Sequence, residues 1–279
     1  MPKVMEKADK RISGEKSSDE FTNRMESASE SLAVQPNETV EIIAHDGEKL
    51  VGHYFPCEKP ERVIIAFHGW RSSWHRDFGM ISDFWYKNNC SVLYVEQRGQ
   101  NNSSGEYMGF GLTERFDCLD WLNWEIERCG SDIPVYLAGV SMGATTVLMA
   151  AGLQLPPNVH GIMADCGFTS ANAIWEHIAK DNLHIRFGIR SAIADRMCRR
   201  KIQVGSKEHS TVEALKHTHV PVILVHGADD HFVPVEMTYE NYTACTAPKD
   251  LLIVPGADHG MSYFMEPEKY ENAVKAFWA

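Results

Sequence analysis

Short apolar runs alternate with amphipathic stretches along the chain from Thr39 to its end. Most runs are apolar on both faces, as in strands buried within a parallel sheet, and the stretches between them have the period of helices. The predicted strands are Thr39–Ala44, Leu50–Phe55, Arg62–Phe67, Ser91–Val95, Val135–Ala138, Gly161–Ala164, Val220–Val225 and Leu251–Val254. The predicted helices are Arg76–Lys87, Thr113–Cys129, Met142–Gly152, Pro234–Cys245 and Pro267–Trp278. This alternation predicts an α/β fold with a mostly parallel eight-stranded sheet and helices on both faces.

The first two predicted strands are joined by a short polar segment that contains Asp46-Gly47. An Asp-Gly pair between two such runs is typical of a tight hairpin turn, because glycine adopts the left-handed backbone conformations that these turns need. We therefore expect an antiparallel hairpin at one edge of the sheet.

One long segment interrupts the alternation, between the strand that ends at Ala164 and the one that begins at Val220. Its length of about fifty residues exceeds what a simple crossover needs. Helical patterns occur at Ile174–Lys180, Ile185–Cys198 and Val212–Lys216, with basic side chains at Arg190, Arg196, Arg199, Arg200 and Lys201. We interpret residues of about 171–217 as an inserted helical cap, since long insertions in α/β folds often cover the ligand site. The alternative is a helical surface excursion that contacts no ligand.

Residues 1–37 differ in composition from the rest of the chain, because Ser, Glu, Lys and Asp dominate and aromatic residues are nearly absent. The pattern indicates a polar N-terminal leader that is either mobile or loosely docked, followed by one domain at 38–279. Within the leader, Ser18–Leu32 has the pattern of a helix capped by Ser18.

Overall composition narrows the class of protein. The 279 residues are 44% hydrophobic and 23% charged, which is ordinary for a globular chain, and the net charge is −11. An acidic surface repels phosphate backbones, so we expect no nucleic-acid partner. No apolar run is long enough to cross a membrane, and the polar N-terminus lacks the apolar core of a secretory signal, so we expect no membrane association. Seven cysteines, an odd number without a CxxC pair, favour a reducing, cytoplasmic location.

The clearest chemical motif is Gly139-Val140-Ser141-Met142-Gly143, which follows a predicted strand and begins a predicted helix. A sharp strand-to-helix turn would expose the hydroxyl of Ser141 at the carboxyl end of the sheet, and the flanking glycines would allow the tight backbone path. The alternative is a glycine-rich turn with a capping serine, but the strand before it and the helix after it make that reading weaker.

An acidic residue and a histidine follow the last two predicted strands. Asp229 and Asp230 lie in segment 226–234 (HGADDHFVP), where either carboxylate could orient an imidazole or cap the helix that begins near Pro234. His259 lies in the segment Gly256-Ala257-Asp258-His259-Gly260. One histidine among 13 carries little information by type alone. Its place after the final strand distinguishes His259 from the others.

Taken together, these motifs resemble the α/β-hydrolase superfamily, within its lineage of serine esterases and peptidase-like hydrolases. A serine, an acid and a histidine occur in the order of the family's triad, each after its own strand. In the family's H-G-x-x-D-x-x-V-P pattern the acid is the fifth residue, which here is Asp230. The resemblance runs from about Thr39 to Trp278 and implies catalytic roles for Ser141, Asp230 and His259.

The resemblance also implies an oxyanion hole. His68-Gly69-Trp70 follows a predicted strand whose loop supplies one of the two donors in this family. The backbone N–H of Trp70 is the implied first donor, and the N–H of Met142, after the serine, is the second.

Two further loops look like those of the family. Segment 96–105 (EQRGQNNSSG) is similar to its D-x-R-G-H-G-x-S-x-G loop, but Glu96, Gln100 and Asn101 depart from that pattern. The loop usually shapes the site without taking part in the chemistry, so these departures concern the subfamily. The loop after the sixth strand begins with Asp165, for which we expect a structural role.

The function implied is that of a serine hydrolase that cleaves carboxylic esters of small or medium acyl or aryl substrates through an acyl-enzyme intermediate. The alternatives are an aminopeptidase-like or amide-cleaving hydrolase and a non-catalytic binding protein on the same fold. No metal or organic cofactor is expected, because neither HExxH nor GxGxxG occurs. The aromatic candidates for the substrate pocket are Trp70, Trp74, Phe168 and Trp175. The sequence does not indicate whether the protein is a monomer or an oligomer.

Overall fold

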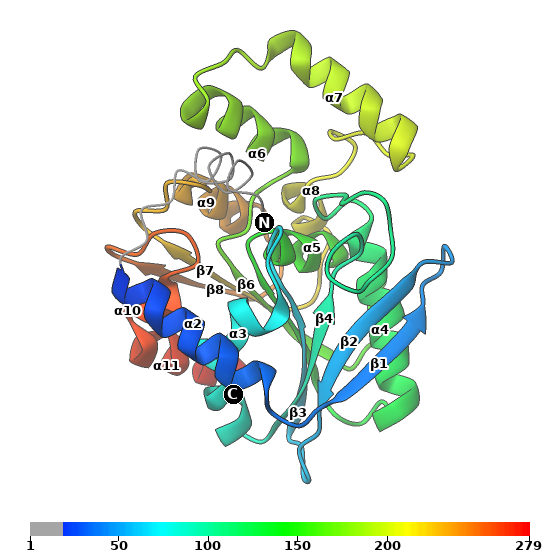
Figure 1. The fold of residues 1–279 in the computed structure, drawn as a ribbon, viewed down its shortest axis with the longest axis vertical. Helices are drawn as coiled ribbons and strands as arrows, with labels where there is room; N and C mark the ends of the chain where they lie inside the picture. Colours follow the sequence, from blue (N-terminus) through cyan, green and yellow to red (C-terminus); the bar gives the residue numbers. More distant parts are fainter. Residues whose placement is uncertain (1–18) are drawn as a thin grey trace.

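An eight-stranded sheet forms the centre of the computed structural model, which describes residues 19–279 (Figure 1). Its order is β1-β2-β4-β3-β5-β6-β7-β8, and all eight predicted strands are confirmed to within a few residues. The strands are β1 (Glu38–Ile43), β2 (Lys49–Phe55), β3 (Arg62–Phe67), β4 (Cys90–Glu96), β5 (Val135–Val140), β6 (Val159–Asp165), β7 (Val222–Gly227) and β8 (Lys249–Val254). The fold is that of an α/β hydrolase.

Only the first two strands run against the others. β1 pairs antiparallel with β2, and β2 pairs antiparallel with β4, whereas every later pair is parallel. The predicted hairpin joins β1 to β2, and Gly47 has a φ of 91° in its turn, where Ala44 N–H donates to Glu48 O. Because the parallel strands end at one edge, the loops that follow β3, β5, β7 and β8 meet there.

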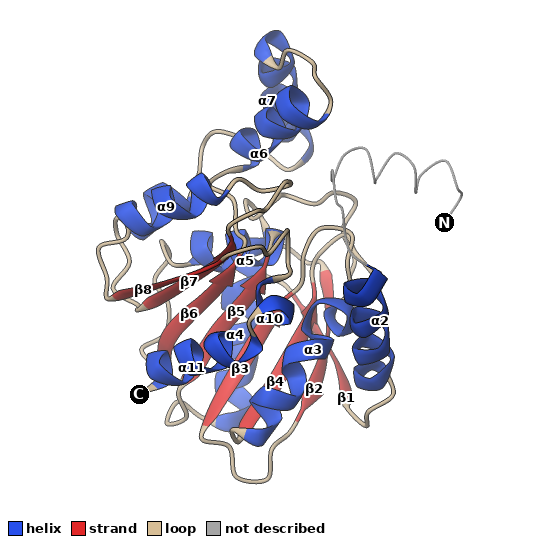
Figure 2. Cartoon of the chain, turned by 90° about the vertical axis from the view of Figure 1, so that its left-hand side faces the viewer, coloured by secondary structure: helices blue, strands red, loops and turns tan. Residues whose placement is uncertain are grey.

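Helices cover both faces of the sheet (Figure 2). α3 and α11 pack with Leu32 of α2 on one face, and α4, α5 and α8 pack on the other. The five predicted crossover and terminal helices are confirmed, and a short helix after β8, α10, is additional. Outside the insertion, the helices are α2 (Asp19–Ala33), α3 (Trp74–Lys87), α4 (Glu114–Cys129), α5 (Met142–Ala150), α9 (Val235–Ala244), α10 (Ser262–Met265) and α11 (Pro267–Trp278).

The helix predicted within the N-terminal leader is confirmed as α2, and its predicted cap, Ser18, lies outside the described residues. Phe21, Met25 and Leu32 are its buried side chains. Its backbone lies so close to α3 that a Cβ on Gly79 would be 2.7 Å from the carbonyl carbon of Ala28. The rest of the predicted leader before α2, residues 1–18, lies outside the described residues.

The insertion between β6 and β7 is helical, as predicted. It comprises α6 (Ala171–His177), a π-helical turn η1 (Ile178–Asn182), α7 (Gly188–Lys201) and α8 (Thr211–Leu215). α6 buries Ile174 against the body, but α7 buries only Ser191. Both views draw α7 beyond α6, away from the sheet (Figures 1 and 2). That the insertion caps a substrate stays a prediction.

Two observations concern the described residues as a set. Within residues 19–279, none of the helices is both long and apolar enough to span a bilayer. All seven cysteines lie in this described range, and each is a free thiol.

Candidate active site

Ser141 lies at the turn between β5 and α5. Its backbone has a φ of 54° and a ψ of −116°, a strained conformation for a residue with a side chain, which typically costs about 1–3 kcal/mol. The Ser141 N–H donates to Asp165 O at 2.9 Å, and Thr145 N–H donates to Ser141 O at 3.0 Å. These bonds fix the turn, so the strand, the strained residue and the helix form the predicted nucleophile elbow.

The two glycines of the motif are needed because neighbouring backbone approaches them closely. A Cβ on Gly139 would lie 2.3 Å from the carbonyl carbon of Gly143. A Cβ on Gly143 would lie 1.8 Å from Phe67 O at the end of β3. Neither position has room for a larger residue, so the spacing of the motif follows from packing.

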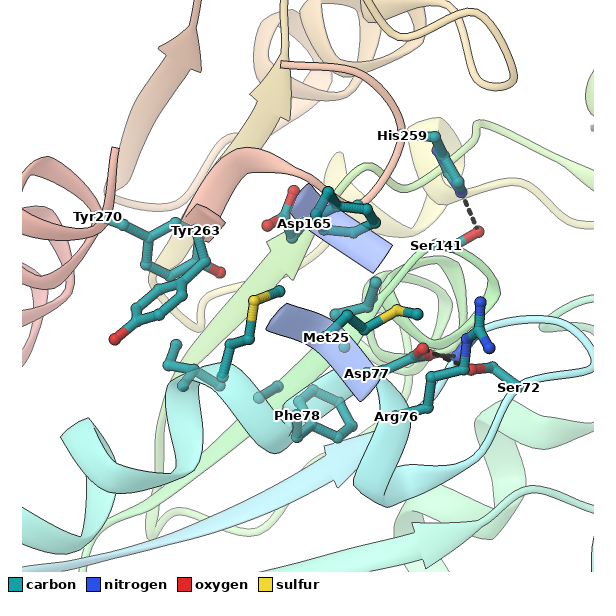
Figure 3. Close-up of a pocket in the computed structure, with 18 of the residues that line it drawn as sticks. Met25, Ser72, Arg76, Asp77, Phe78, Ser141, Asp165, His259, Tyr263 and Tyr270 are labelled. Atoms are coloured by element: carbon teal, nitrogen blue, oxygen red, sulfur yellow. Dashed lines mark hydrogen bonds between the residues drawn. The ribbon is translucent and has the colours of Figure 1, made fainter. Parts of the chain in front are cut away.

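The three residues of the predicted triad meet at the carboxyl edge of the sheet. His259 Nε2 lies 2.9 Å from Ser141 Oγ (Figure 3), and His259 Nδ1 lies 2.7 Å from Asp230 Oδ2. A carboxylate oxygen can only accept, so Nδ1 carries the proton and Nε2 is free to accept from the serine hydroxyl. This arrangement can deprotonate an attacking hydroxyl.

Asp230 is held by four donors. The backbone N–H groups of Phe232 and Val233 donate to Oδ1 at 2.9 and 2.8 Å, while Oδ2 accepts from His259 and from His226 Nε2, the latter at 3.1 Å. Burial disfavours its charge, but the two imidazoles outweigh that effect and keep the pKa of Asp230 below its ordinary value. Asp229, the competing candidate, is exposed. The geometry therefore favours Asp230 as the partner of His259.

The electrostatics of His259 follow from this pairing. Burial lowers the pKa of the imidazole, but the Asp230 carboxylate raises it more, assisted by the Cys166 side chain, so that it stands well above 6.5. Cys166 comes directly after β6, and burial raises the pKa of its own thiol to about 11. His259 is therefore a strong base beside Ser141.

The loop after β3 is held rigidly next to Ser141. Gly69 N–H donates to Asp77 Oδ2 at 2.6 Å, and Arg71 N–H donates to Gln100 Oε1 at 2.6 Å. Between them, the N–H of Trp70 has no acceptor within the described chain, and the same holds for the N–H of Met142 at the start of α5. Two unpaired amides beside a serine hydroxyl can stabilise an oxyanion.

Sequence reasoning missed the residues that hold this loop and the acid. Asp77 also accepts from Ser72 Oγ, and Gln97 Nε2 donates to His68 O. His226 is the first residue of the acid motif, but the sequence assigns it no role; it is fully buried, with Nδ1 2.6 Å from Thr238 Oγ1. A signal existed only for Gln100, as a departure from the family loop, since Gln97 falls on a variable position of that pattern. The contacts of Asp77 depend on how α3 packs.

Three of the four aromatic pocket candidates lie together. Trp70, Phe168 and Trp175 belong to one cluster with Met142 and Phe232, and of the three only Trp70 also lines the cavity next to Ser141. The prediction for Trp74 is wrong. As the first residue of α3, it is buried against β2 and β4, 4.5 Å from the ring of His53, and it does not border the cavity.

Two groups of side chains have metal-ligand spacing, but both are already hydrogen-bonded within the chain. In the group Cys166, Asp230 and His259, the carboxylate is bonded to imidazoles. In the group His45, Asp117 and Asp120, Arg98 Nε donates to Asp117 at 2.7 Å and Asp120 is bonded to His45. Neither group points to a resident ion.

Solved structures share this architecture. An esterase from Pyrococcus furiosus, Pf2001, superimposes with a TM-score of 0.71 and 21% identity over 89% of this chain and 93% of its own. Est1E from Butyrivibrio proteoclasticus, solved with ferulic acid, has a TM-score of 0.67 and 20% identity over 86% and 97%. A puromycin-hydrolyzing peptidase from Mycobacterium tuberculosis has a TM-score of 0.67 and 16% identity over 88% and 39%. At these identities the likeness shows the fold alone.

Comparison by sequence finds a relative and a family model. YqkD of Bacillus subtilis, itself uncharacterized, is 25% identical over 230 residues, which are 81% of this chain and 73% of that protein. The family model described as "Alpha/beta hydrolase family" matches residues 63–273, which include the elbow, the acid and the histidine. The chain therefore belongs to the alpha/beta hydrolase family.

Proposed function

We propose that the protein is a serine hydrolase that cleaves carboxylic esters with small or medium acyl or aryl groups through an acyl-enzyme intermediate. The observation that carries this proposal is the hydrogen-bonded chain from Ser141 Oγ through His259 to Asp230, with separations of 2.9 and 2.7 Å. The esterase folds among the structural neighbours support an ester as the substrate.

In the first step, Ser141 Oγ attacks the ester carbonyl while His259 Nε2 takes the hydroxyl proton. Asp230 stabilises the resulting imidazolium. The N–H groups of Trp70 and Met142 hold the oxyanion of the tetrahedral intermediate, and losing one such donor typically costs about 10²–10³ in rate. His259 then protonates the departing alcohol, which leaves an ester bond between the acyl group and Ser141.

In the second step, His259 removes a proton from water, and the hydroxide formed attacks the acyl carbonyl. The bond to Ser141 Oγ breaks, the serine regains a proton from His259, and a carboxylic acid is released. The balance requires only the ester and water, so the chain's own residues are sufficient.

A fluorophosphonate probe tests the nucleophile. We expect covalent labelling of the protein and its loss in Ser141→Ala, detected on a gel, with circular dichroism as the control for folding. Absence of labelling in the folded wild-type protein would support the alternative of a non-catalytic binding protein.

A substrate panel tests the ester preference. We expect p-nitrophenyl acetate to be hydrolysed faster than alanine p-nitroanilide, with both activities absent in Ser141→Ala. The puromycin-hydrolyzing peptidase among the structural neighbours keeps amide cleavage as the second candidate. Faster turnover of the anilide would establish that candidate and reject the esterase.

A further inference from the structure

A cavity of about 560 Å³ begins beside Ser141 and His259 and continues beneath α2. This volume lies within the range of about 300–1,000 Å³ that is usual for small-molecule sites. The helical insertion contributes no residue to its lining, which comes instead from α2, α3, the strand ends and the segment with α10 and α11. The cavity therefore extends from the serine toward the α2 side of the molecule.

The polar and apolar parts of this cavity are separated. Ser72, Arg76 and Asp77 gather near Ser141, whereas Met25 lies deeper, between them and the two tyrosines of the far side (Figure 3). The inner lining is largely apolar and consists of Phe78, Ile81, Trp85, Met163, Tyr270 and Val274. An apolar group attached to a carbonyl at Ser141 could extend inward along these side chains.

Three carboxyl groups line the cavity: Glu26, which is exposed, and Asp77 and Asp165, which are engaged by neighbouring donors. Ser262 Oγ donates to Asp165 Oδ1 at 3.0 Å. Burial raises the pKa of Asp165 and so disfavours its charged form. Asp77 is likewise engaged by Gly69 and Ser72. Apart from the exposed Glu26, the lining thus favours an uncharged chain over the ammonium group of an aminoacyl substrate.

α2 is attached firmly enough to form one side of a binding site. Besides the close contact at Gly79, Ser29 Oγ lies 2.7 Å from His75 Nδ1 of α3. At its other end, Phe21 and Met25 pack with Ala257 and Met261, which flank His259 in sequence. The helix therefore connects the wall of the cavity with the loop that carries the imidazole.

The course of the reaction decides which part of an ester belongs in this enclosed space. The alcohol must leave after the first step, whereas the acyl group stays on Ser141 until water attacks. His259, which protonates the alcohol, contacts Phe232 at a ring distance of 5.0 Å, and Phe232 both lines the cavity and packs with Ile174 of the insertion. The acyl group then has the cavity beneath α2 available to it.

Building on the proposed function, we propose that the cavity beneath α2 is the acyl site and that it selects esters of unbranched, medium-length aliphatic acids. The N-terminal helix, through Met25, is then a specificity-determining part of the enzyme. Each methylene group moved from water into such a site favours binding by up to about fourfold.

The test is a series of p-nitrophenyl esters from acetate to dodecanoate. In the full-length wild-type protein, kcat/KM should rise from acetate to a medium-length ester and then fall. Met25→Trp fills the cavity, so the ratio of kcat/KM for decanoate to that for acetate should drop at least tenfold. Met25→Ala enlarges it, so the optimum should move to a longer chain.

Met197→Trp is the matched control, because Met197 lies on α7 and is 58% exposed. Its chain-length profile should equal that of the wild type. Circular dichroism shows whether each variant is folded. A profile that is flat, or that neither Met25 variant changes while acetate is still hydrolysed, would overturn the acyl site and leave the proposed function intact.

A binding measurement separates the two proposals further. Ser141→Ala cannot form the acyl-enzyme, but it should bind decanoate, detected by quenching of tryptophan fluorescence, and adding Met25→Trp should weaken that binding at least tenfold. Decanoate binding without any ester hydrolysis by the wild type would keep the site and reject the esterase. No binding by Ser141→Ala would reject the site.

Discussion

Two helices, α2 and α7, lie outside the strand–helix alternation, and they pack very differently. α2 buries three side chains, and its backbone touches α3 at Gly79. α7 is nearly as long but buries only Ser191, and Ile189 on it is 84% exposed. The polar N-terminal segment therefore lines the cavity beside Ser141, whereas the most prominent helix of the insertion lies away from it.

The length of an insertion therefore does not identify the segment that lines a site. α2 has a complementary surface, because Gly79 lets two helix backbones approach closely. The exposed apolar residues of α7, Ile189, Ile193 and Met197, recur every four residues on the side opposite its one buried residue. Within the described residues, these three side chains remain exposed.

The largest expected effect is the loss of activity when the acid of the triad is changed. Asp230→Asn keeps the shape of the acid but removes its charge and favours the wrong tautomer of His259. In a serine protease triad this change lowers kcat about 10⁴-fold, and we expect a similar loss here in steady-state ester hydrolysis. The matched control is Asp229→Asn, since Asp229 is exposed. Equal losses in the two variants would mean that Asp230 does not act on His259.

The pH profile of ester hydrolysis tests the pairing of His259 with Asp230. The base must be neutral, and Asp230 holds its pKa well above 6.5 despite burial. We therefore expect kcat/KM to fall on the acid side with a midpoint above pH 6.5. In Asp230→Asn, the remaining activity should show a midpoint at lower pH. An unchanged midpoint would show that another group controls this limb.

The raised pKa of His259 also affects the stability of the fold, and here the contribution is present at low pH and lost at high pH. Because the folded-state pKa of His259 is raised, its pairing with Asp230 stabilises the fold fully below about pH 6.5. That contribution is lost as the pH rises through the folded-state pKa. Activity thus increases over the range in which this pair stops stabilising the protein.

Local patterns were sufficient to predict the strands, the elbow and the order of Ser141, Asp230 and His259, because each depends on a few adjacent residues. They could not predict that Trp74 is buried against β2 and β4, since an aromatic residue at a helix start fits either a core or a pocket. α10 is too short for a periodic signal, and the roles of Asp77 and Gly79 depend on partners distant in sequence.

A pair of glycine substitutions compares the packing of the two helices directly. In Gly79→Ala, the new Cβ would lie 2.7 Å from the backbone of Ala28 on α2, so we expect a loss of about 1–3 kcal/mol in the free energy of unfolding. In Gly188→Ala, on α7, no atom lies within 4 Å of the new Cβ. That change should be neutral or stabilise by up to about 1 kcal/mol. Urea unfolding measures both, and similar values for the two would mean that α2 is not tightly docked.

The smallest expected effect is that of Ile189→Ser on α7. Because the side chain is 84% exposed, the free energy of unfolding should change by no more than about 0.5 kcal/mol, and kcat/KM for p-nitrophenyl esters should be unchanged. The matched control within the same insertion is Ile174→Ser on α6, which is 1% exposed and should lose about 2–5 kcal/mol. If Ile189→Ser instead lowered ester turnover while stability held, α7 would have to contact the substrate during catalysis, and the contrast between the two helices would no longer describe the working enzyme.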